Sequence, residues 1–372
     1  MTDAQVAPAK AKRLYVAELE GLRGILALWV FIYHALTISD VWNRIPPKVA
    51  EVFNGNQAVC VFIILSGFVI TVLLATTRDD YLTYIARRFI RLWPTLMACL
   101  LGALVAQSLG MMPSRGEPTW LHLALHAVML HGLPPTWLLP EAPGSILNPA
   151  WSISLEWQFY LLAPFALMGK RSVYTRFFLS AFAAVFLYRV MGPLLGNLIE
   201  GAVVLPDFAH LFAVGIASGL VFLHFQSAGD EERRQITRLT AAAGIAFALF
   251  LPIVMNVPTL LWAVVFFLVL LSRCRHRLDP GSRFLLLPAV QLLGAVSYPF
   301  YLCHEIWIWV TQTALVDQTT SDLAAFAAHM IIALPASLIS AWLLHRYVEV
   351  PTIAWGKGFT RKAVVAKTSG CA

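Results

Sequence analysis

Long apolar runs that recur along the whole chain are the sequence feature that most constrains this fold. A helix that rises ~1.5 Å per residue crosses ~30 Å of hydrocarbon in roughly 20 residues, and most of the runs reach that length. They cover residues 24–39, 57–76, 92–110, 149–168, 177–195, 206–224, 239–255, 257–272, 287–316 and 324–345. We therefore predict an all-α membrane protein, a polytopic bundle of about ten transmembrane helices. The apolar stretch 120–131 is too short to span, which indicates an interfacial or re-entrant segment.

The composition supports the same class. Hydrophobic residues make up 59% of the chain and charged residues 13%, and the mean hydropathy is +0.72. A soluble domain has no core large enough to bury so many apolar side chains. We expect one membrane domain over residues 1–372, with a cytoplasmic tail at 1–13, the transmembrane bundle at 14–355 and a second cytoplasmic tail at 356–372.

Basic residues predict the orientation of the bundle in the bilayer. With the N-terminus inside, Lys and Arg gather in every cytoplasmic loop, as the positive-inside rule requires. The loops expected outside hold only Arg44, Lys48 and Arg115. Both termini are then cytoplasmic, and we expect the N-terminal segment to be retained. The net charge of +7 is spread over these loops, so it predicts no nucleic-acid partner and the lipid bilayer as the surrounding medium.

Arg23 and His34 are the first polar residues that an apolar helix does not explain. A polar side chain in hydrocarbon costs several kcal/mol unless it faces other helices or water, so each is a functional candidate. His34 follows Arg23 by eleven positions, which places the two side chains ~16 Å apart in depth and within ~20° on one helix face. The alternatives are a neutral imidazole bonded to a carbonyl and an arginine that anchors the inner helix end.

Glu156 is the second candidate. It follows Asn148, the expected outer end of its span, by eight residues, or ~12 Å, which gives it a depth similar to that of His34. A carboxylate there could orient His34 as a general base. The alternative is a structural ion pair or hydrogen bond. Candidate substrate-binding residues beside it are Trp151, Ser152 and Ser154, although serine in a membrane helix also serves packing.

Two further clusters carry polar groups. Arg88 and Arg91 share a helix face at the inner start of a span, where they suit bidentate contacts to phosphate or act as anchors. Near residue 300, Pro299 should kink the helix that carries His304 and Glu305. A broken helix with these side chains indicates a cavity wall, so we include both residues in the candidate substrate site.

Other polar residues carry weaker signals. His122 and His126 have the spacing of metal ligands but no acidic third ligand nearby, so we predict no metal site. Arg189 lies within a span, where it could snorkel or bind a substrate group. The five cysteines form no CxxC motif and no pair in a loop expected outside, and we predict neither a disulfide nor a bound cofactor.

Together these residues resemble a known pattern, that of the acyltransferase family 3 membrane proteins. This family includes the O-acetyltransferases of bacterial polysaccharides, lipopolysaccharide, Nod factors and macrolides. The resemblance runs from about residue 14 to residue 355. The matching segments are Leu19–Gly24 with His34, Phe62–Phe68, Arg88 with Arg91, Trp151–Glu156 and Ser297–His304.

The resemblance implies a ten-helix enzyme of the bacterial inner membrane. Such an enzyme moves an acyl group, commonly acetyl from cytoplasmic acetyl-CoA, to a hydroxyl of a sugar-containing acceptor such as an exopolysaccharide or another glycan or glycolipid. Arg23 and His34 match the arginine-x10-histidine motif of the family, with His34 as the catalytic residue, either general base or transient acyl carrier. Arg88 and Arg91 match its RxxR motif for the acyl-CoA donor.

The chain departs from the family pattern at two positions. Glu20 stands where aspartate is usual, and Trp157 stands where a second acidic residue often follows Glu156. The second departure argues against schemes that need two adjacent carboxylates.

Two other function classes remain open at this level. A transporter or flippase would use intramembrane His, Glu and Arg to bind substrate or relay protons, and paired broken helices would identify it. A scaffold or sensor would leave the Arg23 and His34 stripe without a purpose. The sequence leaves the acceptor, the regiochemistry, the acyl chain and the oligomeric state open.

Overall fold

A computed structural model describes residues 16–358 apart from 78, 170–171, 188–189, 191–193, 195, 197, 251–252, 276–278 and 318. The protein is 80% helical, and the described part of the chain contains no strand, which confirms an all-α fold. The expected tail 1–13, the tail 356–372 beyond residue 358, and Arg189 lie outside the described residues.

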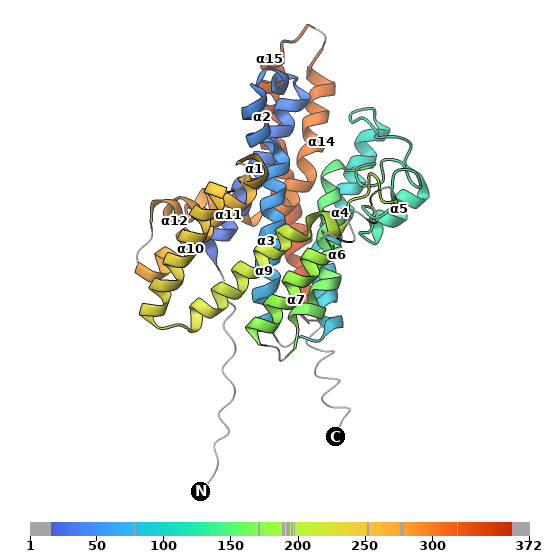
Figure 1. Ribbon diagram of the computed structural model, residues 1–372. Helices are drawn as coiled ribbons and strands as arrows, with labels where there is room; N and C mark the ends of the chain where they lie inside the picture. Colours follow the sequence, from blue (N-terminus) through green and yellow to red (C-terminus); the bar gives the residue numbers. More distant parts are fainter. Residues whose placement is uncertain are drawn as a thin grey trace.

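The long helices run roughly lengthwise through an elongated bundle (Figure 1). They are α1 (Ala17–Ile38), α3 (Gly55–Thr76), α4 (Tyr81–Ser108), α6 (Trp151–Leu167), α7 (Val173–Phe186), α9 (Leu205–Ser227), α10 (Asp230–Phe250), α11 (Ile253–Arg275), α14 (Ser297–Leu315) and α16 (Leu334–Leu344). Shorter helices connect them: α2 (Pro47–Phe53), α5 (Trp120–Ala127), α12 (Pro280–Leu285) and α13 (Pro288–Ala295). Helix α15 (Asp322–Ala328) instead continues into α16 through a π-helical turn, so that Asp322–Gly358 forms one helix.

Six segments of the described residues are long and apolar enough to span a membrane. They are Ala17–Ile38, Pro47–Thr76, Tyr81–Ser108, Leu205–Ser227, Val257–Arg275 and Asp322–Gly358. The expected count of about ten is therefore not confirmed, although described helices also lie within the other four apolar runs. One of these helices, α6, is short for a span because it has 17 residues.

The apolar run 287–316 forms two helices instead of one kinked helix. We expected Pro299 to bend a continuous span, but α13 ends at Ala295 and α14 begins at Ser297. Pro299 then lies in the first turn of α14, where the missing N–H needs no helical partner. The prediction of a break was right, and its position was wrong by one turn.

Close packing between α3 and α9 forms one wall of the core. A Cβ added to Gly215 would lie 2.0 Å from the Ile64 carbonyl oxygen, so the two backbones touch there. Small residues allow this approach, which is how helices in a lipid environment gain van der Waals contact. Trp262 of α11 packs behind this wall and donates its indole N–H to Ser218 at 2.9 Å.

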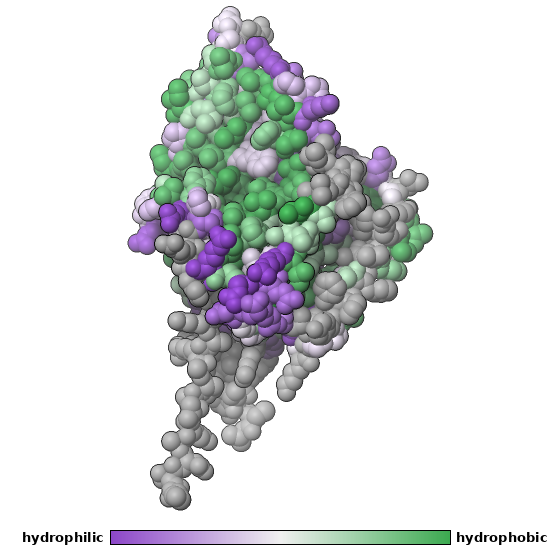
Figure 2. Space-filling model, turned by 60° about the vertical axis from the view of Figure 1, so that its left-hand side comes forward, coloured by the Kyte–Doolittle hydropathy of each residue, from purple (hydrophilic) through white to green (hydrophobic). Residues whose placement is uncertain are grey.

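Large apolar side chains cover much of the outer surface. In Figure 2 a broad hydrophobic area lies above a hydrophilic patch near the middle of the view. Exposed apolar residues include Leu101, Phe165 and Ile331, with exposed fractions of 64%, 66% and 72%. Such an extensive apolar surface suits contact with lipid, in agreement with a membrane protein.

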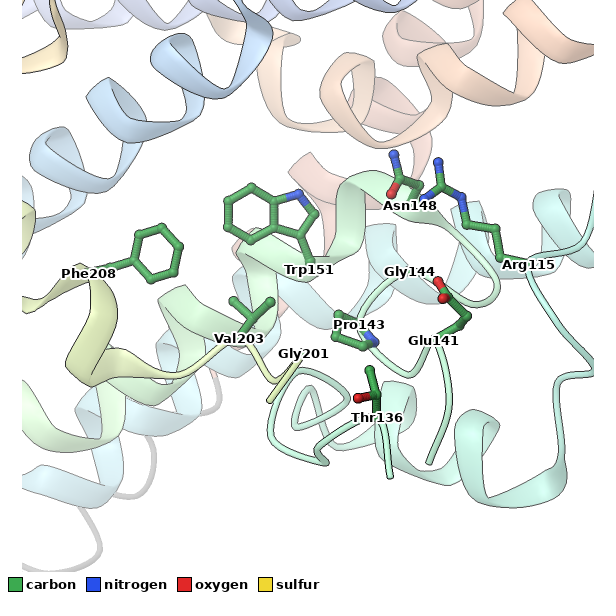
Figure 3. Close-up of a pocket in the computed structure, with 10 residues that line it drawn as sticks. All are labelled: Arg115, Thr136, Glu141, Pro143, Gly144, Asn148, Trp151, Gly201, Val203 and Phe208. Carbon is green, nitrogen blue, oxygen red and sulfur yellow. The ribbon is translucent and has the colours of Figure 1, made fainter. Parts of the chain in front are cut away.

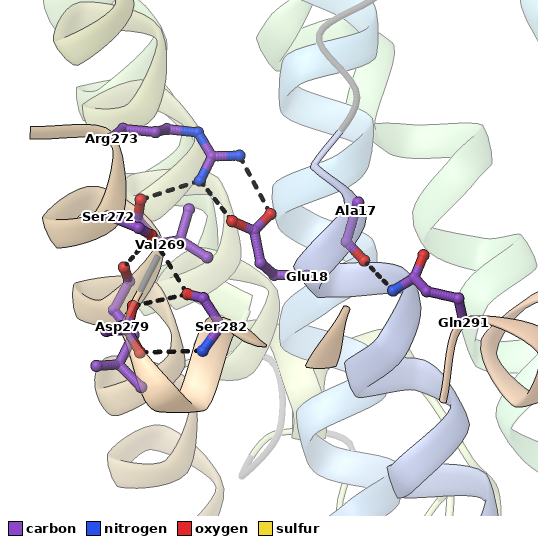
Figure 4. A network of polar contacts seen from close by, with 9 residues as sticks. Ala17, Glu18, Val269, Ser272, Arg273, Asp279, Ser282 and Gln291 are labelled. Atoms are coloured by element: carbon purple, nitrogen blue, oxygen red, sulfur yellow. Dashed lines mark hydrogen bonds and ion pairs between the residues drawn. The ribbon is translucent and has the colours of Figure 1, made fainter. Parts of the chain in front are cut away.

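An ion pair links the first turn of α1 to the end of α11 (Figure 4). The Arg273 guanidinium donates to both carboxylate oxygens of Glu18, at 3.0 and 3.2 Å, in a bidentate arrangement. Beside it, the Gln291 amide donates to the Ala17 carbonyl oxygen at 2.9 Å and ties the start of α1 to α13. These contacts fix the first turn of the helix that carries Arg23 and His34.

Candidate functional site

A pair of histidines lies between α1 and α14. His34 Nδ1 is 2.7 Å from His304 Nε2, and the two rings are nearly parallel, with centroids 5.0 Å apart. The predicted site residue His304 is thus brought directly to His34. Phe31 and Phe300 pack around the pair, and His304 is fully buried.

The hydrogen bonds of this pair determine its neutral tautomers. His304 Nδ1 lies 2.8 Å from the Tyr301 carbonyl oxygen, which only accepts, so this nitrogen carries the proton. His304 Nε2 is then an acceptor, and His34 Nδ1 must donate to it. The lone pair of His34 is left on Nε2, which has no hydrogen-bond partner among the described residues. The half-buried His34 ring is therefore held with a basic nitrogen facing away from its partner.

Glu305, the next residue along α14, is a buried carboxyl beside the histidines. Its exposed fraction is 3%, its Oε1 accepts a long bond of 3.4 Å from Trp309, and its Oε2 has no partner of normal geometry in the described structure. Asn148 and Arg115 lie near enough to act on this carboxyl. Glu305 therefore lies on the side of the histidine pair that faces the loops before α6.

A second cluster of polar groups lines a cavity of about 540 Å³ farther along the bundle. The three predicted arginines Arg23, Arg88 and Arg91 all line it, which brings residues of α1 and α4 together as expected. We call it the arginine cavity. The side of it formed by α3 is mostly apolar and includes Phe68 and Val72.

Two of the three arginines are available to an anion. Arg23 donates to Ser297 Oγ at 3.4 Å, Arg88 lies over the Tyr160 ring, and neither forms an ion pair within 4.0 Å among the described residues. Arg88 Nε is buried without a hydrogen-bond partner in that part of the chain. Arg91 instead lies 3.5 Å from Glu349. A guanidinium whose donors are unused is the group that binds a phosphate or carboxylate most strongly.

Glu156 lies in the arginine cavity and not beside His34, so the expected pairing is wrong. Its carboxylate accepts a hydrogen bond of 2.6 Å from Ser66 and a short one from the Tyr160 hydroxyl. The error came from assuming that Asn148 marks the outer end of a span. His304 of α14 takes the place beside His34 that we expected Glu156 to hold.

Contacts at the start of α6 show why Glu156 lies deeper than expected. The Tyr301 hydroxyl, one turn before His304, is within 2.9 Å of Ser152 Oγ and donates to the Pro149 carbonyl oxygen at 3.1 Å. The helix therefore begins at the level of the histidines, inside the bundle. Glu156 follows Ser152 by one turn, about 6 Å farther toward the arginines.

The serines predicted to bind substrate have partners within the bundle. Ser154 is fully buried, and its Oγ accepts the Gly132 backbone N–H at 3.0 Å. Ser152 bonds to Tyr301 and to the Pro149 carbonyl oxygen. Neither lines one of the two cavities described, so we leave both out of the substrate site. Trp151 does line a cavity, among the loops beyond the histidines.

Sequence reasoning missed two residues of the arginine cavity, His345 and Glu349. Both belong to a π-helical turn, His345–Glu349, and the imidazole Nδ1 lies 2.8 Å from Glu349 Oε2. π-turns often mark functional positions because they widen the helix locally. The available signal was the i, i+4 spacing of the two residues at the end of the last apolar run, which places them on one helix face.

His122 has a structural role. Its Nδ1 accepts the Thr119 backbone N–H at 3.0 Å in a helix cap, and its Nε2 is 3.0 Å from the Pro140 carbonyl oxygen. Both ring nitrogens are thus engaged by protein groups at the start of α5. The absence of a metal site stays a prediction.

Comparison with known proteins shows which proteins this chain is similar to. A family model described as an acyltransferase domain matches residues 16–346. The chain is also 30% identical over 162 residues to the acyltransferase MdmB of Streptomyces mycarofaciens, a match that covers 42% of this chain and 40% of that protein. No solved structure matches the chain.

Proposed function

The chain belongs to this acyltransferase family, and on that premise we propose that it transfers an acetyl group from acetyl-CoA to a hydroxyl of a sugar-containing acceptor. The observation that carries the proposal is the pair of sites on one helix: α1 supplies both Arg23 to the arginine cavity and His34 to the histidine pair. A phosphate-rich donor needs a basic site, whereas a hydroxyl acceptor needs a base that takes its proton.

The arginine cavity is the proposed donor site. Coenzyme A carries a diphosphate and a third phosphate, and Arg23 and Arg88 have no carboxylate within ion-pair distance among the described residues. Arg91 would exchange its contact with Glu349 for a phosphate. Charge-assisted bonds of this kind contribute roughly 1.5–3 kcal/mol each.

His34 is the proposed general base. The acceptor hydroxyl gives its proton to His34 Nε2 while its oxygen attacks the thioester carbonyl carbon. The tetrahedral intermediate then expels the thiolate of coenzyme A, and the imidazolium returns the proton to that sulfur. His304 keeps the Nε2 lone pair in place through the bond from His34 Nδ1. The alternative in which His34 carries the acyl group uses the same nitrogen and predicts ping-pong kinetics instead of a ternary complex.

The donor and the base must be linked across part of the membrane. His34 follows Arg23 by eleven positions, or ~16 Å along α1, so the pantetheine arm would extend along this helix from the arginines to the histidine. With both termini in the cytoplasm, the arginine cavity faces cytoplasmic acetyl-CoA, and the histidines lie nearer the outer face of a bacterial inner membrane. Exported glycans would then be acetylated there.

The family match favours transfer chemistry over the transporter or flippase alternative. The direct test is transfer by purified protein in lipid nanodiscs, supplied with radiolabelled acetyl-CoA and a set of glycosides. Labelled ester on a glycoside supports the proposal. If another acyl-CoA labels the acceptor and acetyl-CoA does not, the assignment of acetyl-CoA as the donor is wrong. A protein that transfers no acyl group would refute the proposal.

A further inference from the structure

A second cavity, of about 440 Å³, lies among the loops next to the start of α6 (Figure 3). Its size falls within the ~300–1,000 Å³ typical of small-molecule sites. The walls come from residues far apart in sequence, namely the stretch 115–151 and the stretch 201–208. We call it the aromatic pocket.

Backbone hydrogen bonds make the pocket a built site. The Thr136 N–H donates to the Glu200 carbonyl oxygen at 2.9 Å, and the Val203 N–H donates to the Gly132 carbonyl oxygen at 2.7 Å. The Gln158 side chain of α6 ties the same segment to the bundle, since its amide donates to the Val203 carbonyl oxygen at 2.9 Å. These bonds join the two loop segments to each other and to a helix.

The pocket has one aromatic side and one polar side. Trp151 and Phe208 face each other with ring centroids 5.8 Å apart, and Figure 3 shows both rings at one end of the cavity. At the other end Asn148 and Arg115 lie together, with the Glu141 carboxylate near them. The two charged groups are of opposite sign, so together with Asn148 they present hydrogen-bonding groups without a net charge.

The pocket lies next to the histidine pair. Asn148 lines it and also acts on the Glu305 carboxyl, which directly follows His304 in the chain. Arg115 lines it as well and lies near enough to interact electrostatically with both His34 and Glu305. The buried Glu305 carboxyl thus lies close to two residues that line the pocket, and its Oε2 has no hydrogen-bond partner of normal geometry among the described residues.

We infer that the aromatic pocket is the acceptor site and that it holds a neutral sugar ring, an inference that rests on the proposed acyltransferase activity. A sugar presents C–H groups on its faces and hydroxyls around its edge. The Trp151 indole would pack against a face, while Asn148, Arg115 and Glu141 would bond the edge and direct one hydroxyl toward His34. Aromatic rings combined with a few fixed polar groups are the usual means of orienting such a ligand.

The test measures acceptor and donor kinetics separately. Full-length protein in nanodiscs, free of glycoside detergents, receives acetyl-CoA and a panel of neutral methyl glycosides. Trp151→Ala should raise the KM for the glycoside at least tenfold and leave the KM for acetyl-CoA within about twofold. Arg115→Gln, at an exposed position, should raise the glycoside KM at least threefold. Trp120→Ala, at a tryptophan that is 78% exposed and outside the pocket, is the matched control and should change neither constant.

The outcomes separate this inference from the proposed function. If the wild type transfers acetyl groups and both pocket variants behave like Trp120→Ala, the acceptor site is elsewhere and the inference fails. If the wild type transfers nothing, saturation-transfer NMR with the same glycosides shows whether the pocket binds a sugar. A signal that Trp151→Ala abolishes supports a sugar site in a protein of different activity, whereas no signal from the wild type overturns the inference as well.

Discussion

Replacing His304 with phenylalanine should slow transfer without weakening the binding of either substrate. The phenyl ring keeps an aromatic side chain beside Phe31 and Phe300, but His34 Nδ1 loses its acceptor. A buried donor without a partner costs about 1–3 kcal/mol. The ring of His34 can then turn or adopt the other tautomer, and Nε2 is no longer held as the base.

The size of the effect follows from that cost. Each 1.36 kcal/mol changes a rate by about tenfold, so kcat should fall roughly 5- to 150-fold while both KM values change little. The assay is steady-state transfer of labelled acetyl by purified protein. His304→Gln is the matched variant, because its side-chain oxygen can accept from His34 Nδ1 and should restore most of the rate.

Two results would refute this reasoning. Equal losses in His304→Phe and His304→Gln would mean that the accepted hydrogen bond is not what matters. A rate for His304→Phe within twofold of the wild type would mean that His304 does not position His34 at all.

Two further changes test other parts of the structure. Arg91→Gln should raise the KM for acetyl-CoA by about 10- to 150-fold, because a charge-assisted bond to phosphate contributes roughly 1.5–3 kcal/mol. Glu349→Gln should lower that KM, because it removes the carboxylate that competes for Arg91. An unchanged KM in both variants would place the donor elsewhere. Glu18→Gln should reduce the free energy of unfolding by about 1–3 kcal/mol, since it leaves the partly buried Arg273 without its ion pair. Thermal unfolding in nanodiscs measures this loss. An unchanged unfolding midpoint would show that the ion pair contributes no stability.

Local sequence patterns predicted the helices and the positions of candidate side chains along each helix. The depth of Arg23 and of His34 along α1 follows from helical geometry alone, and Arg88 and Arg91 share a helix face for the same reason. Within a single helix the sequence spacing determines the relative positions of side chains. The depth of Arg23 and the shared face of Arg88 and Arg91 could therefore be predicted, whereas their role in donor binding stays a prediction.

Contacts between helices were harder to predict. The pairing of His34 with His304 depends on how α1 and α14 pack, and nothing within either segment specifies their relative height. Glu156 was misplaced because α6 starts inside the bundle, held there by Tyr301, instead of at the membrane surface. The aromatic pocket joins loops that are more than 50 residues apart, through backbone hydrogen bonds that leave no pattern in the sequence.

The most direct test of the central claim is the rate of acetyl transfer by the His34→Gln variant. Glutamine keeps a similar volume and a hydrogen-bonding side chain but has no basic nitrogen. His224→Gln, at a histidine whose side chain is 56% exposed, is the matched control. If His34 is the general base, the rate falls by about 10²–10⁴ while the control retains the wild-type rate. A folded His34→Gln protein that transfers acetyl at the wild-type rate would contradict the account.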